Sequence, residues 1–200
     1  MSGLEALVLG LVQGLTEFLP VSSSGHLVLF ETLFGIEGEG GLVFEIAVHV
    51  ATLVAILLVY RTRVDSSRYR EAWDYIGKLA VGTVPAVAVA LVAKDAIEAT
   101  FASPSIAATC LLGTAAILWT TRATLPRAHA PAPSCRDALV IGCAQAFAIL
   151  PGISRSGTTV AAALALGVAP IAAADFSFLR GTIAMTGAAV LIGTDLATAR

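Results

Sequence analysis

Two segments of this chain gather groups that can exchange protons or bind phosphate. In the first, Gln13 and Glu17 are four residues apart and so share one face of a helix, and a proline precedes the Ser-Ser-Ser-Gly-His run at 22–26. A carboxylate beside an imidazole can move a proton near neutral pH, and a neighbouring hydroxyl can act as a nucleophile. We therefore take Glu17, Ser23 and His26 as candidate catalytic residues.

The second segment places an arginine among hydroxyl groups. Arg155 lies between two serines just after Pro151 and Gly152, where a helix is expected to begin. A guanidinium binds phosphate oxygens through two parallel hydrogen bonds, and a helix N-terminus adds its free N–H groups. We expect Arg155 to act in both binding and catalysis. The predicted phosphate ligands are Ser22, Ser24, Ser154, Arg155, Ser156 and Thr159.

Simpler roles exist for each of these residues. Serines satisfy backbone groups at helix breaks, a lone histidine is commonly a packing residue, and Arg155 could extend to the membrane surface. A carboxylate in an apolar helix, in contrast, costs a few kcal/mol by insertion scales and is expected to be functional. The position of His26 beside Glu17 and the serines favours the catalytic interpretation.

The composition indicates a protein whose solvent is lipid. Of the 200 residues, 57% are hydrophobic and 13% are charged, which leaves too few polar groups to cover a water-soluble domain. The formal net charge of −2 provides no basic surface for nucleic acid, so that function is excluded. The three cysteines are odd in number and lack metal-ligand spacing, which favours neither zinc nor disulfides. We predict an all-α integral membrane protein.

Four apolar stretches are long enough, or nearly so, to cross a hydrocarbon core of about 30 Å as helices. The last one carries Asp175 and Arg180, whose opposite charges the sequence allows to pair, although a spacing of five is not ideal on a helix. The predicted spans are Leu42 to Tyr60, Lys78 to Ala93, Ser105 to Thr121 and Ile171 to Gly193.

Two further apolar regions, 4–34 and 138–168, are each interrupted by a proline, serine and glycine cluster that a straight helix does not tolerate. Both contain Gly-x-x-Gln followed by Pro-x-x-Ser, which ends at Ser23 in one region and at Ser154 in the other. The half-helices are too short to cross, and irregular backbone at membrane depth needs protein or a water-filled cavity around it. We interpret both regions as re-entrant helical hairpins of an internal repeat.

The arginines predict how these elements lie in the membrane. They concentrate in residues 61–77 and 122–136, whereas residues 1–41 contain no Lys or Arg and residues 94–104 contain only Lys94. Cytoplasmic loops are rich in such residues, so the N-terminus is expected on the extracytoplasmic side. Three spans separate the hairpins, which would therefore enter from opposite sides.

The predicted fold is an inverted-topology repeat with the hairpin tips meeting near the midplane. The chain is expected to form a single membrane domain, 1–200, in which the second repeat is incomplete. The first repeat covers 1–121, with the hairpin at 4–34 and three spans, and the second covers 137–200, with the hairpin at 138–168 and one span.

Glu45 and His49 share a helical face in the first predicted span. Together with Gln13 they are candidates for a supporting role behind the reacting groups. A location of Glu45 near the outer interface, with His49 packed against a neighbour, agrees with the sequence equally well.

The two segments resemble the signatures of the undecaprenyl-diphosphatase family. One is the run from Gln13 to His26, the other runs from Pro151 to Thr159, and the resemblance covers nearly the whole chain. It implies hydrolysis of undecaprenyl (polyprenyl) pyrophosphate to the monophosphate and inorganic phosphate, which recycles the lipid carrier for cell-wall or glycan synthesis. The residues that match the family's essential positions are Glu17, Ser23, His26 and Arg155.

The resemblance also implies a divalent cation, Mg²⁺ or Ca²⁺, for which Glu17 together with Gln13 would be the protein ligands. It implies a multi-pass protein of the plasma membrane whose active site opens to the extracytoplasmic side. Family members continue through two more spans, which are expected to be missing from these 200 residues. Arg180 stands where the family is apolar.

Other interpretations remain open at the level of sequence. Inverted hairpins with an anion site also suit a lipid-phosphate transporter or flippase, and the missing spans suit a truncated, inactive homologue that only binds lipid. A homodimer is a further arrangement that the sequence allows. The attacking group is Ser23, His26 or water, and we favour Ser23 because His26 then serves as its base.

Overall fold

The computed structural model describes residues 2–36, 39–60 and 69–198, apart from the side chains of 39–43, 45–46, 60, 69–72, 184 and 188–198. Within the described residues the fold is all-helical, which confirms the predicted class. The helices are α1 (Gly3–Phe18), α2 (Ser23–Phe34), α3 (Glu39–Tyr60), α4 (Tyr69–Val92), α5 (Lys94–Phe101), α6 (Pro104–Thr124), α7 (Cys135–Phe147), α8 (Arg155–Ala165) and α9 (Pro170–Thr198).

Two helical segments of the described residues are long and apolar enough to cross a membrane. They are Trp73–Val92 in α4 and Pro104–Arg127, which contains α6, and a shorter apolar segment, Ala47–Val59, lies within α3. Large apolar side chains such as Leu112 and Val92 are mostly exposed on the outer surface of the bundle. This surface suits contact with lipid.

Each predicted span lies almost entirely within one helix, namely α3, α4, α6 or α9. Between the second and third spans, residues 94–101 form the short helix α5, for which no prediction was made. Ser103 then caps α6, accepting a hydrogen bond from the backbone N–H of Ile106.

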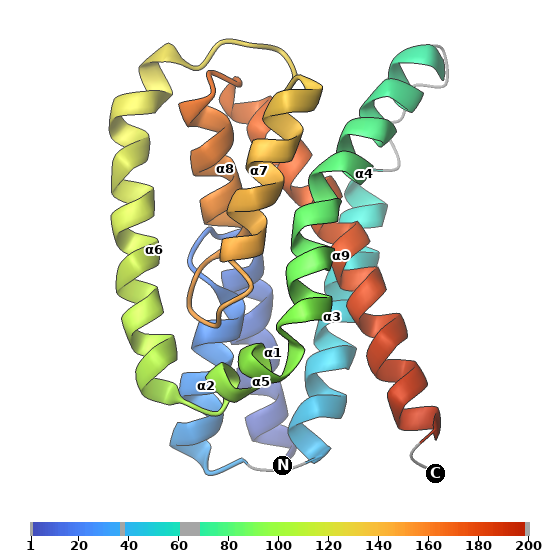
Figure 1. Ribbon diagram of the computed structural model, residues 1–200. Helices are drawn as coiled ribbons and strands as arrows, with labels where there is room; N and C mark the ends of the chain where they lie inside the picture. Colours follow the sequence, from blue (N-terminus) through green and yellow to red (C-terminus); the bar gives the residue numbers. More distant parts are fainter. Residues whose placement is uncertain (1, 37–38, 61–68, 199–200) are drawn as a thin grey trace.

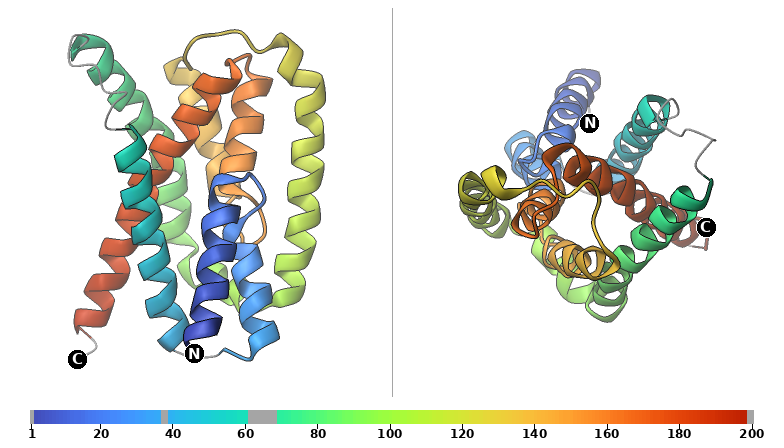
Figure 2. Two further views of the ribbon diagram at one scale, coloured as in Figure 1. Left: turned by 180° about the vertical axis from the view of Figure 1, so that it is seen from behind. Right: turned by 90° about the horizontal axis from the view of Figure 1, so that it is seen from above.

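Two helical hairpins face each other at the centre of the molecule (Figure 1). One consists of α1 and α2, which are joined by the tip at 19–22, and the other of α7 and α8, which are joined by the tip at 148–154. The hairpins enter from opposite ends of the bundle, and their tips lie side by side at mid-height in both lateral views (Figures 1 and 2). Both breaks fall where the sequence predicts them.

The tips are in contact through glycines. A Cβ atom built on Gly25 would lie 2.5 Å from the Cα of Gly152, and one built on Gly157 would lie 2.8 Å from the carbonyl oxygen of Pro20. Because no side chain fits at these distances, glycine at 25 and 157 allows the two backbones to approach each other.

The structure corrects the alignment of the repeat. The serine that caps the broken helix is Ser22 in one hairpin and Ser154 in the other, 132 positions apart. Gly25 and Gly157 have the same separation. Pairing the prolines, as in the sequence analysis, matches Ser23 with Ser154 and is therefore off by one residue. The caps fix where each helix begins, so Arg155 is the counterpart of Ser23.

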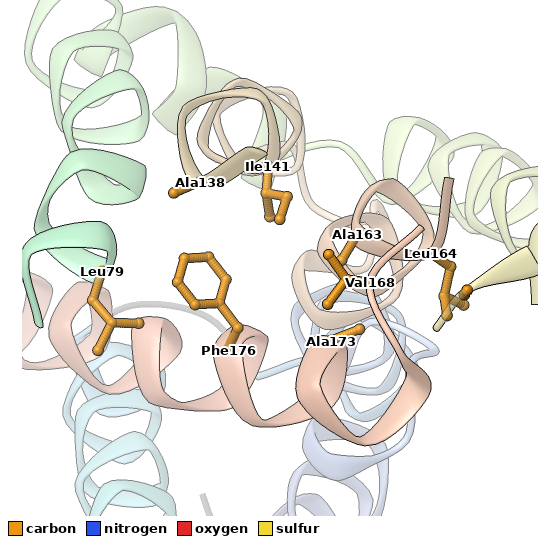
Figure 3. Packing of buried hydrophobic residues seen from close by; sticks show 9 residues of the cluster. Leu79, Ala138, Ile141, Ala163, Leu164, Val168, Ala173 and Phe176 are labelled. Carbon is orange, nitrogen blue, oxygen red and sulfur yellow. The ribbon is translucent and has the colours of Figure 1, made fainter. Parts of the chain in front are cut away.

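A core of buried apolar side chains anchors the second hairpin to α4 and α9. Phe176 of α9 lies between Leu79 of α4 and the α7 residues Ala138 and Ile141 (Figure 3). Tyr75 packs edge-on against Phe176, with ring centroids 5.8 Å apart. These contacts hold α7 and α9 in place around the second tip.

The equivalent glycines of α1 and α7 have different surroundings. A Cβ on Gly142 would lie 2.3 Å from the carbonyl oxygen of Gly82 in α4, whereas a Cβ on Gly10 would meet nothing within 4 Å. Gly142 thus permits close packing of α4 on α7, while Gly10 has no comparable neighbour.

Gly142→Ala should lower the melting temperature of the purified protein in detergent, because overpacking of a tight contact typically costs about 1–3 kcal/mol. Gly10→Ala is the matched control and should be neutral or slightly stabilising, since alanine favours a helix by up to about 1 kcal/mol. Equal melting temperatures for the two variants would contradict the role assigned to the α4–α7 contact.

Candidate functional site

The carboxylate of Glu17 connects the two hairpin tips. Glu17 lies at the end of α1 and is 8% exposed. One of its oxygens, Oε2, accepts a short hydrogen bond from the hydroxyl of Ser23, the first residue of α2. The other, Oε1, lies 2.5 Å from Nη2 of Arg155, the first residue of α8. Three predicted site residues from three helices are therefore in direct contact.

Capping by serine places Ser23 and Arg155 at the tips. The hydroxyl of Ser22 accepts from the backbone N–H of Gly25 at 3.4 Å, and that of Ser154 accepts from Gly157 at 3.0 Å. Each cap lets a helix begin within the tip, so that its free N–H groups and positive dipole end lie near the Glu17 carboxylate.

The first tip is also strained. Ser22 has a φ of 68°, and among the described residues it is the one non-glycine with a positive φ. A side chain in this region costs on the order of 1–3 kcal/mol, and such positions cluster at functional sites. Ser154 has an ordinary φ of −66°, so the strain is confined to the hairpin that carries Glu17.

The predicted phosphate ligands separate into two groups by burial. Ser24 and Ser156 are half-buried, and each lies 3.4 Å from the hydroxyl of its buried capping serine, Ser22 or Ser154. The capping hydroxyls are already used by the backbone. Ser24 and Ser156 therefore have the freer hydroxyls of the set.

Thr159 faces away from the tip. The residue is 1% exposed, and its hydroxyl donates to the carbonyl oxygen of Arg155 at 2.9 Å and lies 2.6 Å from the hydroxyl of Ser177 in α9. The arrangement ties the first turn of α8 to α9. It supports the position of Arg155 from behind.

His26 lies on the first turn of α2. Its Nδ1 is 2.7 Å from the carbonyl oxygen of Ser22. A carbonyl only accepts, so Nδ1 carries the hydrogen and Nε2 of the neutral ring is left as an acceptor. The described contact of Ser23 is with Glu17, which makes Glu17 the base nearest to the serine hydroxyl.

Of the three predicted supporting residues, Gln13 contacts the site residue Glu17. Gln13 is buried, donates to Glu17 at 3.5 Å and accepts from the hydroxyl of Thr52 at 3.2 Å. His49 is half-buried on α3. The side chain of Glu45 lies outside the described residues.

Glu17 and Gln13 are the residues that would hold the divalent cation that the family resemblance implies. No group of three or more His, Cys, Asp or Glu side chains able to hold a metal occurs within the described residues. Glu17 and the amide oxygen of Gln13 supply one carboxylate and one neutral ligand, which matches Mg²⁺ sites completed by substrate phosphates.

Thr114, a buried residue of α6, was not among the predicted site residues. Its hydroxyl accepts from the backbone N–H of Ser154 at 2.8 Å and donates to the carbonyl oxygen of Gly152 at 2.6 Å. These two bonds hold the second tip against α6. A single threonine in an apolar span carries no motif, and only the folded contact identifies its role.

The pairing of Asp175 with Arg180 that the sequence allows does not form. All three guanidinium nitrogens of Arg180 are buried without a hydrogen-bond partner. At a spacing of five the two side chains leave α9 in different directions, so that of Arg180 enters the bundle interior instead.

Comparison with known proteins identifies close relatives. The model of the family described as bacitracin resistance protein BacA matches residues 6–199. An undecaprenyl-diphosphatase of Bacteroides thetaiotaomicron is 43% identical over 199 residues, covering 96% of this chain and 75% of that protein. One from Carboxydothermus hydrogenoformans is 44% identical, with 96% and 73% covered. Undecaprenyl-diphosphatase 2 of Stutzerimonas stutzeri is 42% identical, with 90% and 72% covered.

Thr114→Val keeps the shape of the side chain but removes both hydrogen bonds to the second tip. It should lower the melting temperature, because a buried backbone group left unsatisfied costs about 1–3 kcal/mol. Thr109→Val is the control, since that hydroxyl is exposed and bonds only within α6, to Ser105. Identical melting temperatures for Thr114→Val and the control would show that Thr114 does not hold the tip.

Proposed function

Because this chain belongs to the bacitracin resistance protein BacA family, we propose that it acts as an undecaprenyl-diphosphatase. It is an enzyme that hydrolyses undecaprenyl pyrophosphate to undecaprenyl phosphate and inorganic phosphate. The product monophosphate is the form that can carry the next glycan precursor, so the reaction would return the lipid carrier to use. The relatives' names support this activity, and the matched region includes every candidate site residue.

The observation that carries the proposal is the contact of Ser23 and Arg155 with the same carboxylate. Glu17 holds a hydroxyl on one oxygen and a guanidinium on the other. A nucleophile, its base and a phosphate ligand therefore lie within one hydrogen-bonded cluster. Phosphoryl transfer requires chiefly such positioning and charge stabilisation.

Substrate binding would use both tips. The diphosphate would accept hydrogen bonds from Arg155, from the hydroxyls of Ser24 and Ser156, and from free N–H groups at the starts of α2 and α8. Helix N-termini and guanidinium groups are suited to phosphate oxygens. The polyprenyl chain would stay in lipid along the apolar outer surface.

In the first chemical step, the Oγ of Ser23 would attack the terminal phosphorus while Glu17 accepts the hydroxyl proton. The bond between that phosphorus and the bridging oxygen breaks, and undecaprenyl phosphate leaves with the bridging oxygen and its electron pair. Arg155 would stabilise charge on the phosphoryl oxygens throughout.

In the second step, a water would attack the phosphoserine, with Nε2 of His26 taking one of its protons. The serine oxygen leaves and recovers a proton from Glu17, and inorganic phosphate is released. Direct attack by water or by His26 on the substrate is the competing route, in which Ser23 only orients the phosphate.

A divalent cation, Mg²⁺ or Ca²⁺, is proposed to enter with the diphosphate, with Glu17 and Gln13 as its protein ligands. Such an ion would neutralise negative charge on the phosphate oxygens. Both oxygens of Glu17 are engaged by Ser23 and Arg155, so cation binding by the protein alone should be weak.

The placement in the membrane is part of the proposal. We place the protein in the plasma membrane, with both hairpins re-entrant and the repeats inverted, so that the site opens to the extracytoplasmic side. The opposed hairpins and meeting tips support this topology, because irregular backbone at membrane depth must be enclosed by protein. Residues 61–68, which belong to one predicted cytoplasmic loop, lie outside the described residues.

Transport is the less favoured function. Moving an anion requires a guanidinium and helix dipoles, which the site has, but not a hydroxyl bonded to a carboxylate. The contact between Ser23 and Glu17 is therefore the specific reason to prefer hydrolysis. An assay of phosphate release also distinguishes an active enzyme from a homologue that only binds lipid.

Ser23→Ala, Glu17→Ala and His26→Ala should each reduce phosphate release from undecaprenyl pyrophosphate by about 100-fold or more, with binding of the lipid less affected. The measurement is turnover by the purified protein in detergent with Mg²⁺, and Ser2→Ala, at the exposed cap of α1, is the control. The absence of phosphate release from the wild type would contradict the proposed function. Turnover above about a tenth of wild type in Ser23→Ala would remove Ser23 as the nucleophile.

A further inference from the structure

Arg180 is a buried cation with no polar partner. It lies in α9 with 0% of its side chain exposed, and none of its three guanidinium nitrogens has a hydrogen-bond partner. Among the described side chains it contacts the ring of Phe176, whose centre lies 5.4 Å from Cζ. A buried charge without a partner is strongly destabilising, so its retention needs a reason outside folding stability.

Glycine makes the space that Arg180 occupies. A Cβ built on Gly82 of α4 would lie 3.2 Å from both Cδ and Nη1 of Arg180, and 3.0 Å from the carbonyl oxygen of Ala138 in α7. A side chain at position 82 would therefore compete with the guanidinium for the junction of α4, α7 and α9. The junction has room for the arginine side chain but provides, among the described residues, no hydrogen-bond acceptor for its guanidinium.

The next residue of α9 borders the candidate site. The carbonyl oxygen of Gly181 accepts from Nη1 of Arg155 at 3.3 Å, and a Cβ on Gly181 would lie 3.2 Å from Cζ of Arg155. Arg155 therefore contacts α9 at the residue that follows Arg180, and the positive charges of the two arginines repel each other. Of these two arginines, Arg155 is the one that contacts the carboxylate of Glu17, whereas the guanidinium of Arg180 has no hydrogen-bond partner within the described part of the chain.

We propose that Arg180 is a second guanidinium for the diphosphate of the substrate, a role that rests on the proposed function. Arg155 would bind one phosphate, and Arg180 would turn from Phe176 to the other. The aromatic contact given up is a weak cation–π interaction, whereas a guanidinium–phosphate pair is a charge-assisted, bidentate interaction. A diphosphate has the additional phosphate that a second guanidinium needs, so Arg180 selects diphosphates over monophosphates.

The first test compares Arg180→Met, which keeps much of the side-chain volume, with Arg122→Met. Arg122 stacks on Trp119 near the end of α6, away from the tips, with Cζ 3.6 Å from the ring centre. In Arg180→Met, kcat/KM for undecaprenyl pyrophosphate should fall by about 10-fold or more. Inhibition by inorganic pyrophosphate should weaken more than inhibition by orthophosphate, and Arg122→Met should leave both unchanged. A kcat/KM within twofold of wild type and unchanged pyrophosphate inhibition would contradict the proposal.

The second test measures binding without turnover. Inorganic pyrophosphate should raise the melting temperature of the wild type more than orthophosphate does, and this difference should vanish in Arg180→Met, while the ligand-free variant is at least as stable as wild type. If Arg180→Met does not fold, the same measurement is made on Arg180→Gln. A wild-type response to pyrophosphate in the variant used would show that water or packing, and not phosphate, satisfies Arg180.

The two proposals fail separately. A wild-type protein that releases no phosphate but shows pyrophosphate stabilisation dependent on Arg180 would contradict the hydrolase and support the diphosphate site. An active wild type whose activity does not change in Arg180→Met would support the hydrolase and contradict the diphosphate site.

Discussion

The buried carboxylate of Glu17 is the constraint on which the site depends. A charge at this depth requires compensation, and the two partners that supply it come from opposite hairpins, Ser23 from α2 and Arg155 from α8. The hairpins must therefore stop at the same level and bring their backbones into contact. Gly25 and Gly157 permit this contact because they lack a side chain where the tips meet. The ion pair of Glu17 and Arg155 thus joins the two tips and also belongs to the proposed catalytic cluster.

The internal repeat supplies a symmetric frame that the chain uses asymmetrically. The capping serines and the tip glycines occur at equal spacing in both halves, whereas the first residue of the broken helix is Ser23 in one half and Arg155 in the other. The frame thereby brings a hydroxyl and a guanidinium to equivalent positions on either side of one carboxylate. An identical pair of hairpins would place two hydroxyls or two cations there, and neither pair combines the proposed nucleophile with the proposed phosphate ligand.

The sequence predicted the features that follow from local chemistry. Proline and glycine clusters end helices, so both hairpin breaks were found, and polar groups in apolar helices are costly, so Glu17 and Arg155 were identified. Contacts between distant segments were not accessible in this way. The two hydrogen bonds of Thr114 to the second tip, the contact of Ser23 with Glu17 rather than with His26, and the failure of Arg180 to reach Asp175 all depend on how helices pack. The capping serines, not the prolines, set the register of the repeat.

The central claim is that Glu17 and Arg155 act as one unit across the two tips. A double-mutant cycle on phosphate release from undecaprenyl pyrophosphate tests it most directly, using wild type, Glu17→Gln, Arg155→Gln and the double variant. Residues that act as a unit are strongly non-additive. We predict that each single substitution lowers turnover by about 100-fold or more and that the double variant is little worse than either. Losses that multiply in the double variant would show that Glu17 and Arg155 act independently and would contradict their action as one unit.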